Sequence, residues 1–450
     1  MELKQYFSQL KGWGTNGIGT WFDPAGSVDP FSTDPLYRWA RARPIEEWNR
    51  KRDLLIVAQK EGLATTLCIT PNVVYIDQLQ SELAAEANRG EYIGPNLCPS
   101  NPEARRIILR NCENMFRFLA EGGVKLNYIL AALRDFGGCG CSDCEPWMNT
   151  FLELWEEISP LMLKYHPETK VQFCTWWVSP EEMMFLTEYL EIKQPPWVDG
   201  VNASMGYDIE LPEFSLPPGY RKTAFFHISY ASGHSDKYGV KGAVVAPKRL
   251  EEICRRLSSS GYQGYQAYSE GIFEDLNKFL VSRLGEDATQ DAKELVREYC
   301  RSQFSTSPQD TDLLVEAIYA MEDLQNEDGE KLACIFGGIG RKYNLADNWR
   351  YAMLEVRAQV AKLEHEIGTE QEWEKAITEL KPHDQGEYIL RLEKLIEERK
   401  KILVHLERNV YRVGVQNHVM IIDYDYQPFV RWRENRSQDK LQNIGGEFEV

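Results

Sequence analysis

The sequence predicts an α/β fold, a TIM-like (β/α)8 barrel followed by an α-helical C-terminal domain. Three observations lead to this prediction. Short apolar runs alternate with amphipathic segments as far as about residue 285, as in parallel strands joined by right-handed crossovers. These segments lack the glycine-rich phosphate loop that usually accompanies a doubly wound sheet. Beyond about residue 288 the strand signal fades and long amphipathic helices follow.

Seven strands can be counted in the N-terminal part. They are expected at residues 17–24, 64–72, 128–133, 171–179, 198–205, 222–229 and 264–271. A (β/α)8 barrel needs eight strands. We therefore expect the first barrel strand to be missing and the chain to begin in the helix that follows it, and the source of the eighth strand stays open.

Helices are expected between these strands and throughout the C-terminal part. Ser100 or Asn101 caps a helix that has Pro102 in its first turn and runs to Gly122, and residues 179–182 (Ser-Pro-Glu-Glu) begin another. The other expected helices cover residues 43–61, 149–165, 247–259, 291–303, 310–324, 348–367 and 386–413.

These elements suggest two domains, a catalytic barrel over residues 1–285 and a helical domain over residues 286–450. The last two long helices are dense in Glu, Lys and Arg on one face. Such a face is normally solvated or belongs to an antiparallel helical pair, and a homodimer formed through this domain stays open.

Composition excludes several classes of function. The net charge of −18 argues against nucleic acid and anionic membranes, which require basic surfaces. No apolar run reaches the length of about 18 residues that a membrane helix needs. The N-terminus has no signal-peptide core, and ten scattered cysteines do not form a disulfide framework. We expect a cytoplasmic protein, unless an export signal has been removed.

The carboxyl ends of the predicted strands carry the candidate catalytic groups, because barrel enzymes place their active sites there. The apolar run 128–133 ends in Arg134 and Asp135, and Glu270 follows the last strand. Glycosidic cleavage needs one protonated and one ionised carboxyl group, and Asp135 and Glu270 are the preferred pair. Arg134 would keep Asp135 ionised, whereas the tyrosines near Glu270 would raise its pKa and make it the acid.

Aromatic and polar residues at the same strand ends suggest a carbohydrate substrate, because apolar sugar faces stack on rings and hydroxyls bond to polar groups. The expected substrate-binding residues are Asp23, Asn72, Arg134, Trp176, Trp177, Asp208, His227, His234 and Tyr268. Neighbours in a strand point in opposite directions, so one of Trp176 and Trp177 is expected to pack rather than bind.

A second candidate site is a group of cysteines. Cys139, Cys141 and Cys144 have the spacing C-x-C-x2-C, and Cys98 lies in the loop after the preceding strand. Four thiolates make a closed structural zinc site, which would hold the catalytic loop in place. Free thiols and a disulfide are the alternatives, and no cofactor is expected for catalysis.

Three segments resemble poorly characterised bacterial proteins related to barrel glycoside hydrolases: Leu97–Arg105, Arg134–Trp147 and Tyr268–Leu280. At the level of fold, residues 10–300 are similar to family 20 hexosaminidases, family 67 α-glucuronidases and the family 163 group. The resemblance implies a catalytic carboxylate at Asp135 and a sugar-binding residue at Glu270. Family 20 has Asp-Glu where this chain has Arg-Asp, so attack by a substrate acetamido group is in doubt. Family 67 proteins append a similar helical domain.

The sequence therefore predicts a glycoside hydrolase with a two-carboxylate mechanism. A non-catalytic carbohydrate-binding barrel is one alternative. A lyase or isomerase that uses His227 or His234 with a metal is another. Structural roles also stay open: Asp135 in a turn-capping pair, Glu270 at a helix N-terminus, and His227 as a buried core histidine.

Overall fold

The computed structural model describes residues 3–22, 24, 26–32, 42–86, 94–133, 138–231, 234, 236, 238–323, 329–411 and 426–445. The chain divides into two compact units. The first comprises residues 1–227 and 253–268, and the second comprises residues 228–252 and 269–450.

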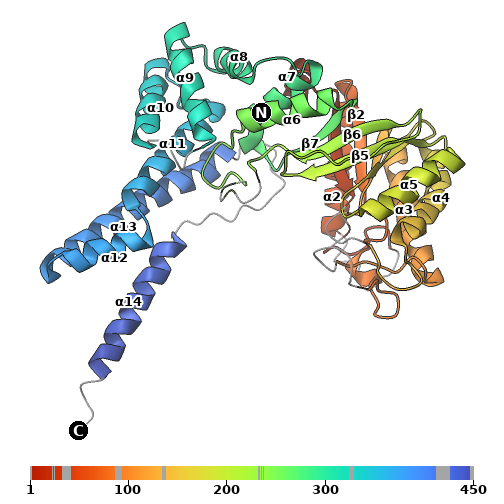
Figure 1. Ribbon diagram of the computed structural model, residues 1–450, viewed down its shortest axis with the longest axis horizontal. Coiled ribbons are helices and arrows are strands. Elements are labelled where there is room, and N and C mark those ends of the chain that lie inside the picture. Colours follow the sequence, from red (N-terminus) through yellow and green to blue (C-terminus); the bar gives the residue numbers. More distant parts are fainter. Residues whose placement is uncertain are drawn as a thin grey trace. The chain divides into compact units, whose positions relative to one another are not determined.

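A parallel sheet of seven strands forms the first unit's centre (Figure 1). The strands are β1 (Gly17–Phe22), β2 (Ala64–Ile69), β3 (Tyr128–Ala131), β4 (Lys170–Cys174), β5 (Val198–Gly206), β6 (Arg221–His227) and β7 (Tyr265–Tyr268). They lie side by side in sequence order, each paired in parallel with the next. All seven predicted strands and the TIM-like α/β class are confirmed. Within the described residues, no further strand joins β7 to β1.

The sheet curls so that its edge strands approach each other through their side chains. The ring centroids of Trp21 on β1 and Tyr268 on β7 lie 6.1 Å apart, although five strands separate β1 from β7 in the sheet. In a flat sheet, strand spacings of about 4.8 Å would separate these residues by about 30 Å. The seven strands therefore form an incomplete barrel with an inner and an outer face.

Helices cover the outer face of this sheet. They are α2 (Ala42–Lys60), α3 (Pro102–Glu121), α4 (Trp147–Tyr165) and α5 (Pro180–Lys193). The helix α1 (Leu3–Gly12) and the C-terminal part of α6 (Pro247–Ser259) also belong to the first unit. The predicted caps are present: the side chain of Asn101 accepts hydrogen bonds from the backbone of Glu103 and Ala104, and Ser179 and Glu182 cap each other. These bonds satisfy N–H groups that a helix start leaves without partners.

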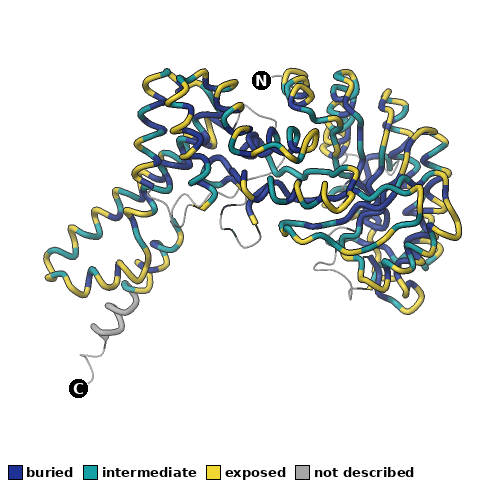
Figure 2. Tube along the Cα trace, turned by 45° about the horizontal axis from the view of Figure 1, so that its top comes forward, coloured by how far each residue is buried: buried dark blue, intermediate teal, exposed yellow. Residues whose placement is uncertain are grey.

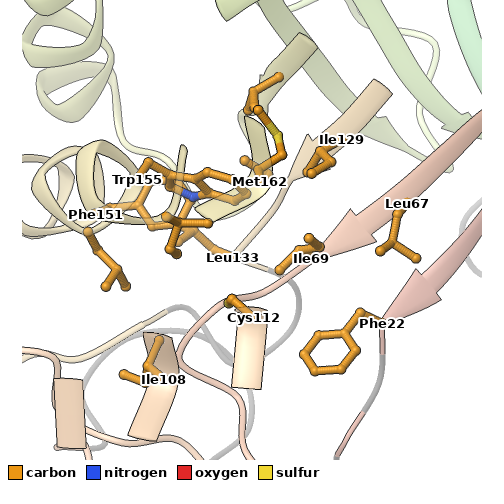
Figure 3. Packing of buried hydrophobic residues seen from close by; sticks show 14 of the residues in the cluster. Phe22, Leu67, Ile69, Ile108, Cys112, Ile129, Leu133, Phe151, Trp155 and Met162 are labelled. Atoms are coloured by element: carbon orange, nitrogen blue, oxygen red, sulfur yellow. The ribbon is translucent and has the colours of Figure 1, made fainter. Parts of the chain in front are cut away.

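Alternation along the strands decides which side chains face the helices, because successive residues point to opposite faces. Phe22, Leu67, Ile69 and Ile129 are buried in one hydrophobic core with residues of α3 and α4. The residues labelled in Figure 3 show this packing: Phe22, Leu67, Ile69, Ile108, Cys112, Ile129, Leu133, Phe151, Trp155 and Met162. The residues next to them along the strands, such as Trp21, Cys68 and Leu130, point the other way and belong to a separate cluster on the inner face.

The second unit is mainly helical, as predicted for the C-terminal part. Its helices are α7 (Asp275–Glu286), α8 (Ala292–Phe304), α9 (Pro308–Met321), α10 (Gly329–Tyr343), α11 (Trp349–Ile367), α12 (Glu370–Glu379), α13 (Pro382–His405) and α14 (Gln427–Gly445), with the N-terminal part of α6. The helices α7, α10, α12 and α14 were not among the predicted helices. The expected domain boundary, 285/286, falls at the end of α7 and stays a prediction.

Burial differs between the helices of this unit. More than half of α11 is buried, whereas α13 buries only Leu392, Ile396, Arg399 and Leu403, which form one stripe at helical spacing (Figure 2). The charge-laced face of α13 is therefore solvated in the chain. No described helix combines the length and the apolar character that a membrane crossing requires.

Candidate functional site

Aromatic rings line the inner face of the sheet near the carboxyl ends of its strands. Trp21, Phe225 and Tyr268 contact one another, with Phe225 at 6.3 Å from Trp21 and 5.7 Å from Tyr268 between ring centroids. The ring of Trp176, which follows β4, lies 5.8 Å from that of Phe225. Phe225 is buried, but the other three rings are only partly buried. We call these four residues the aromatic row.

His227 extends this inner face but is itself packed. Its ring stacks on Tyr207 with centroids 4.0 Å apart and lies 4.7 Å from the ring of Tyr268. Only 8% of His227 is exposed. This packing agrees with the core-histidine alternative as well as with a binding role.

A polar layer lies on the inner side toward the amino ends of the strands, and the sequence did not predict it. The carboxylate of Asp199 accepts hydrogen bonds from Gln172 at 2.7 Å and from Arg221 at 2.9 Å. Thr223 donates to Gln172 at 3.3 Å and accepts from Asn202 at 3.0 Å. Residues at this end of a barrel normally serve stability, so we assign this network to the scaffold.

Three predicted site residues, Asp23, Arg134 and Asp135, lie outside the described residues. The pairing of Asp135 with Glu270 therefore stays a prediction. Asn72 is fully buried and donates to the carbonyl oxygen of Leu97 at 3.3 Å, while its Oδ1 has no hydrogen-bond partner among the described residues.

The remaining predicted residues of the first unit are more exposed. Trp177 has φ of 61° and is 40% exposed, and no described ring contact joins it to the aromatic row. Asp208 is exposed just after β5. Of the predicted residues in this unit, the structure brings Trp176, His227 and Tyr268 together.

His234 belongs to the second unit. Its ring stacks on Tyr230 at 3.8 Å, and its Nδ1 accepts the backbone N–H of Asp236 at 3.1 Å. Burial, together with the nearby charges of Arg357 and Lys241, lowers the pKa of His234 to about 4. The imidazole is therefore neutral near pH 7, and because Nδ1 accepts a hydrogen bond, the ring proton lies on Nε2. In this arrangement neither ring nitrogen has a lone pair available for a metal, so the structure gives no support to a metal-assisted role of His234.

Glu270 is partly buried, and a second carboxylate fixes its backbone. The Glu270 N–H and the Ser269 hydroxyl each donate to Glu274 Oε2 at 2.7 Å. Lys278 donates to the carbonyl oxygen of Gly271, also at 2.7 Å. Sequence reasoning missed Glu274 because an acidic residue at the start of a helix normally indicates only a favourable interaction with the helix dipole.

Because Glu274 is a buried carboxyl group, we predict that the stability of the fold depends on pH. Glu274 is fully buried, and burial raises its pKa from 4.5 to about 7. The fold thus favours the protonated form of Glu274. Its contribution to the free energy of unfolding is complete below about pH 4.5, and about 3 kcal/mol of stability is lost as the pH rises to about 7. Urea denaturation from pH 4.5 to 8 should show a smaller decline for Glu274→Gln than for the wild type. Equal declines would contradict the assignment.

The four predicted cysteines come together. All four Sγ atoms lie within 4.8 Å of one another, and Cys98 Sγ lies 3.7 Å from that of Cys141 and 3.6 Å from that of Cys144. Cys139 and Cys144 are buried, whereas Cys98 and Cys141 are partly buried. A hydrogen bond with Cys144 lowers the pKa of Cys139 to about 5, and burial raises the pKa of Cys98 to about 11.

A surface pocket lies at the opposite, amino end of β6. It is lined by residues 210–215 with Lys222, Arg256, Ser260 and Tyr262. The ammonium group of Lys222 lies over the rings of Phe214 and Tyr262, at 4.3 and 4.5 Å from their centroids. Because the ammonium group of Lys222 already interacts with these two rings, we do not place the active site in this pocket.

No protein-family model matches the sequence, and a comparison with curated proteins finds no match. Solved structures do match. A family GH115 4-O-methyl-α-glucuronidase, BtGH115A, with specificity for decorated arabinogalactans, has a TM-score of 0.53 and 11% sequence identity, and the match covers 88% of this chain and 60% of that chain. This chain thus spans 60% of that enzyme's length.

Two further matches have lower TM-scores. CpGH84B has a TM-score of 0.42 with 12% identity, covering 92% of this chain and 74% of that chain. An endo-1,4-β-mannanase from Eisenia fetida has a TM-score of 0.39 with 11% identity, covering 63% of this chain and 83% of that chain. The likeness to the GH115 enzyme shows a shared fold.

Proposed function

We propose that this protein is a glycoside hydrolase that binds a carbohydrate against the aromatic row and cleaves it with two carboxyl groups. The observation that carries the proposal is the aromatic row itself. Three partly buried rings, those of Trp21, Trp176 and Tyr268, converge on one face. Stacking on such rings is a common way to bind the apolar face of a sugar.

The place of the aromatic row supports a catalytic role rather than a purely structural one. It lies near the carboxyl ends of parallel strands, where barrel enzymes build their active sites from the loops that follow. In the sequence, Asp135 follows β3 and Glu270 follows β7. We propose Asp135 as the ionised carboxylate and Glu270 as the acid. The shared fold with a glucuronidase supports the same class of reaction.

The test is hydrolysis of a panel of aryl glycosides and natural oligosaccharides by the full chain, with binding measured by calorimetry. Turnover of one sugar class supports the proposal. Binding without turnover would overturn the enzymatic part and favour the carbohydrate-binding alternative. Absence of both binding and turnover across the panel would overturn the proposal as a whole.

A variant of the aromatic row tests where the sugar binds. Trp176→Ala should raise KM or Kd about five-fold, since a stacked ring contributes about 1 kcal/mol. Met184→Ala on α5 is the control, because Met184 is 72% exposed and lies outside the aromatic row. Equal affinities of the wild type and Trp176→Ala would place the sugar elsewhere.

A further inference from the structure

We propose that Cys98, Cys139, Cys141 and Cys144 bind one zinc ion as a closed structural site, independently of the proposed hydrolysis. The site joins two separate stretches of the first unit. Cys98 lies between β2 and α3, and the other three cysteines lie between β3 and α4. A bound ion would therefore crosslink the segments that follow two neighbouring strands.

The distances between the sulfur atoms suit a tetrahedral ion. Zinc binds thiolates at about 2.3 Å, which in a tetrahedron separates the sulfurs by about 3.8 Å. Cys98 Sγ lies 3.7 Å from Cys141 Sγ and 3.6 Å from Cys144 Sγ, and no pair in the cluster exceeds 4.8 Å. A disulfide would require a separation of about 2.05 Å, and all four cysteines are free in the structure.

The backbone and neighbouring side chains fix the two segments independently of any ion. The Ser100 hydroxyl donates to the carbonyl oxygen of Asp143 at 2.9 Å, and the Thr150 hydroxyl donates to that of Cys144 at 3.0 Å. Gly138 has φ of 103°, and a Cβ there would lie 2.3 Å from the buried ring of Trp147. The sulfur atoms thus converge because the surrounding chain is held in place.

The number and burial of the thiols indicate a structural role. Four cysteines complete the tetrahedral coordination of zinc and leave no position for water or substrate. Cys139 and Cys144 are fully buried, which favours a site closed to solvent. Cys139 lies four residues after Asp135 in the sequence, so the ion would anchor the segment that carries the proposed catalytic aspartate.

Metal analysis of the purified full chain tests the proposal. We expect one zinc per chain in the wild type and its loss in Cys98→Ser and Cys141→Ser, which change the two partly buried thiols. Cys334→Ser, at an exposed cysteine, and Cys112→Ala, at a buried cysteine outside the cluster, should both retain zinc. Zinc that persists in Cys98→Ser, iron in place of zinc, or a disulfide found by mass spectrometry would overturn the proposal.

A second measurement uses only the wild-type protein, so it does not depend on whether the variants fold. Wild-type protein produced with cobalt in place of zinc should show the intense visible absorption of a tetrahedral cobalt–thiolate centre. A chelator should remove the ion and lower the melting temperature, because metal binding contributes to folding free energy. A wild-type protein that takes up neither metal, and whose melting temperature the chelator leaves unchanged, would contradict the assignment.

Discussion

Asp135→Asn and Glu270→Gln should each lower kcat by about 10²–10⁴-fold, the usual contribution of a general acid or base. Both changes preserve side-chain size while removing the ability to ionise. Glu270→Gln also keeps the backbone N–H of residue 270 that donates to Glu274. Steady-state kinetics on the best substrate from the panel would measure both effects.

The two variants should differ in their pH profiles. The dependence of kcat/KM on pH reports the essential acid and base of the free enzyme. Loss of the acid in Glu270→Gln should remove the fall in rate at high pH, and loss of the carboxylate in Asp135→Asn should remove the fall at low pH. Glu181→Gln, at an exposed residue in the first turn of α5, is the matched control. Full turnover in both variants would mean that other residues carry the chemistry.

Much of the fold could be predicted because its signals are local. The strand β2 lies within the predicted 64–72, and the helix α6 spans the predicted 247–259. Short apolar runs marked the strands, and a polar residue before a proline marked a helix start, as at Asn101. Each of these signals depends only on residues close together in the chain.

The helix α10 shows why other elements could not be predicted. Its sequence, GEKLACIFGGIGRKY, contains four glycines, each of which disfavours an isolated helix by about 1 kcal/mol. The structure uses two of them for close packing. A Cβ at Gly329 would lie 2.8 Å from the backbone nitrogen of Lys362, and one at Gly340 would lie 3.0 Å from the ring of Tyr351. That benefit comes from α11, which local propensity does not include.

The candidate sites likewise contain residues that could be predicted from the sequence and residues that could not. Cys98 could be grouped with Cys139 because parallel neighbouring strands bring their following loops together. Glu274 could not be recognised, because its burial depends on the packing of the second unit rather than on adjacent residues. Trp176 and Trp177 are similar in sequence context, but β4 ends at Cys174, so strand alternation could not decide which tryptophan joins the aromatic row.

Neutralising Asp236 should destabilise the second unit by about 3–5 kcal/mol, because its partner would be left as an unpaired buried charge. Asp236 forms an ion pair with Arg357, and their side chains are 0% and 4% exposed. The carboxylate also accepts the backbone N–H groups of Val240 at 2.7 Å and Lys241 at 3.2 Å. Asp236→Asn removes the charge but keeps one acceptor oxygen, so it retains only one of these two bonds. Chemical denaturation of this variant therefore reports the loss of the ion pair together with one hydrogen bond.

A double-mutant cycle separates the pair from its surroundings. Arg357→Met should be similarly destabilising, and the double variant should be less destabilised than the sum of the two single variants, since it leaves no unpaired charge. The exposed pair Lys248–Asp323, with an Nζ–Oδ2 distance of 2.8 Å and side chains 48% and 61% exposed, is the control. Asp323→Asn should cost less than about 1 kcal/mol because water screens that pair. Additive effects at Asp236 and Arg357 would mean that each side chain stabilises the fold through other contacts and that their mutual attraction contributes little.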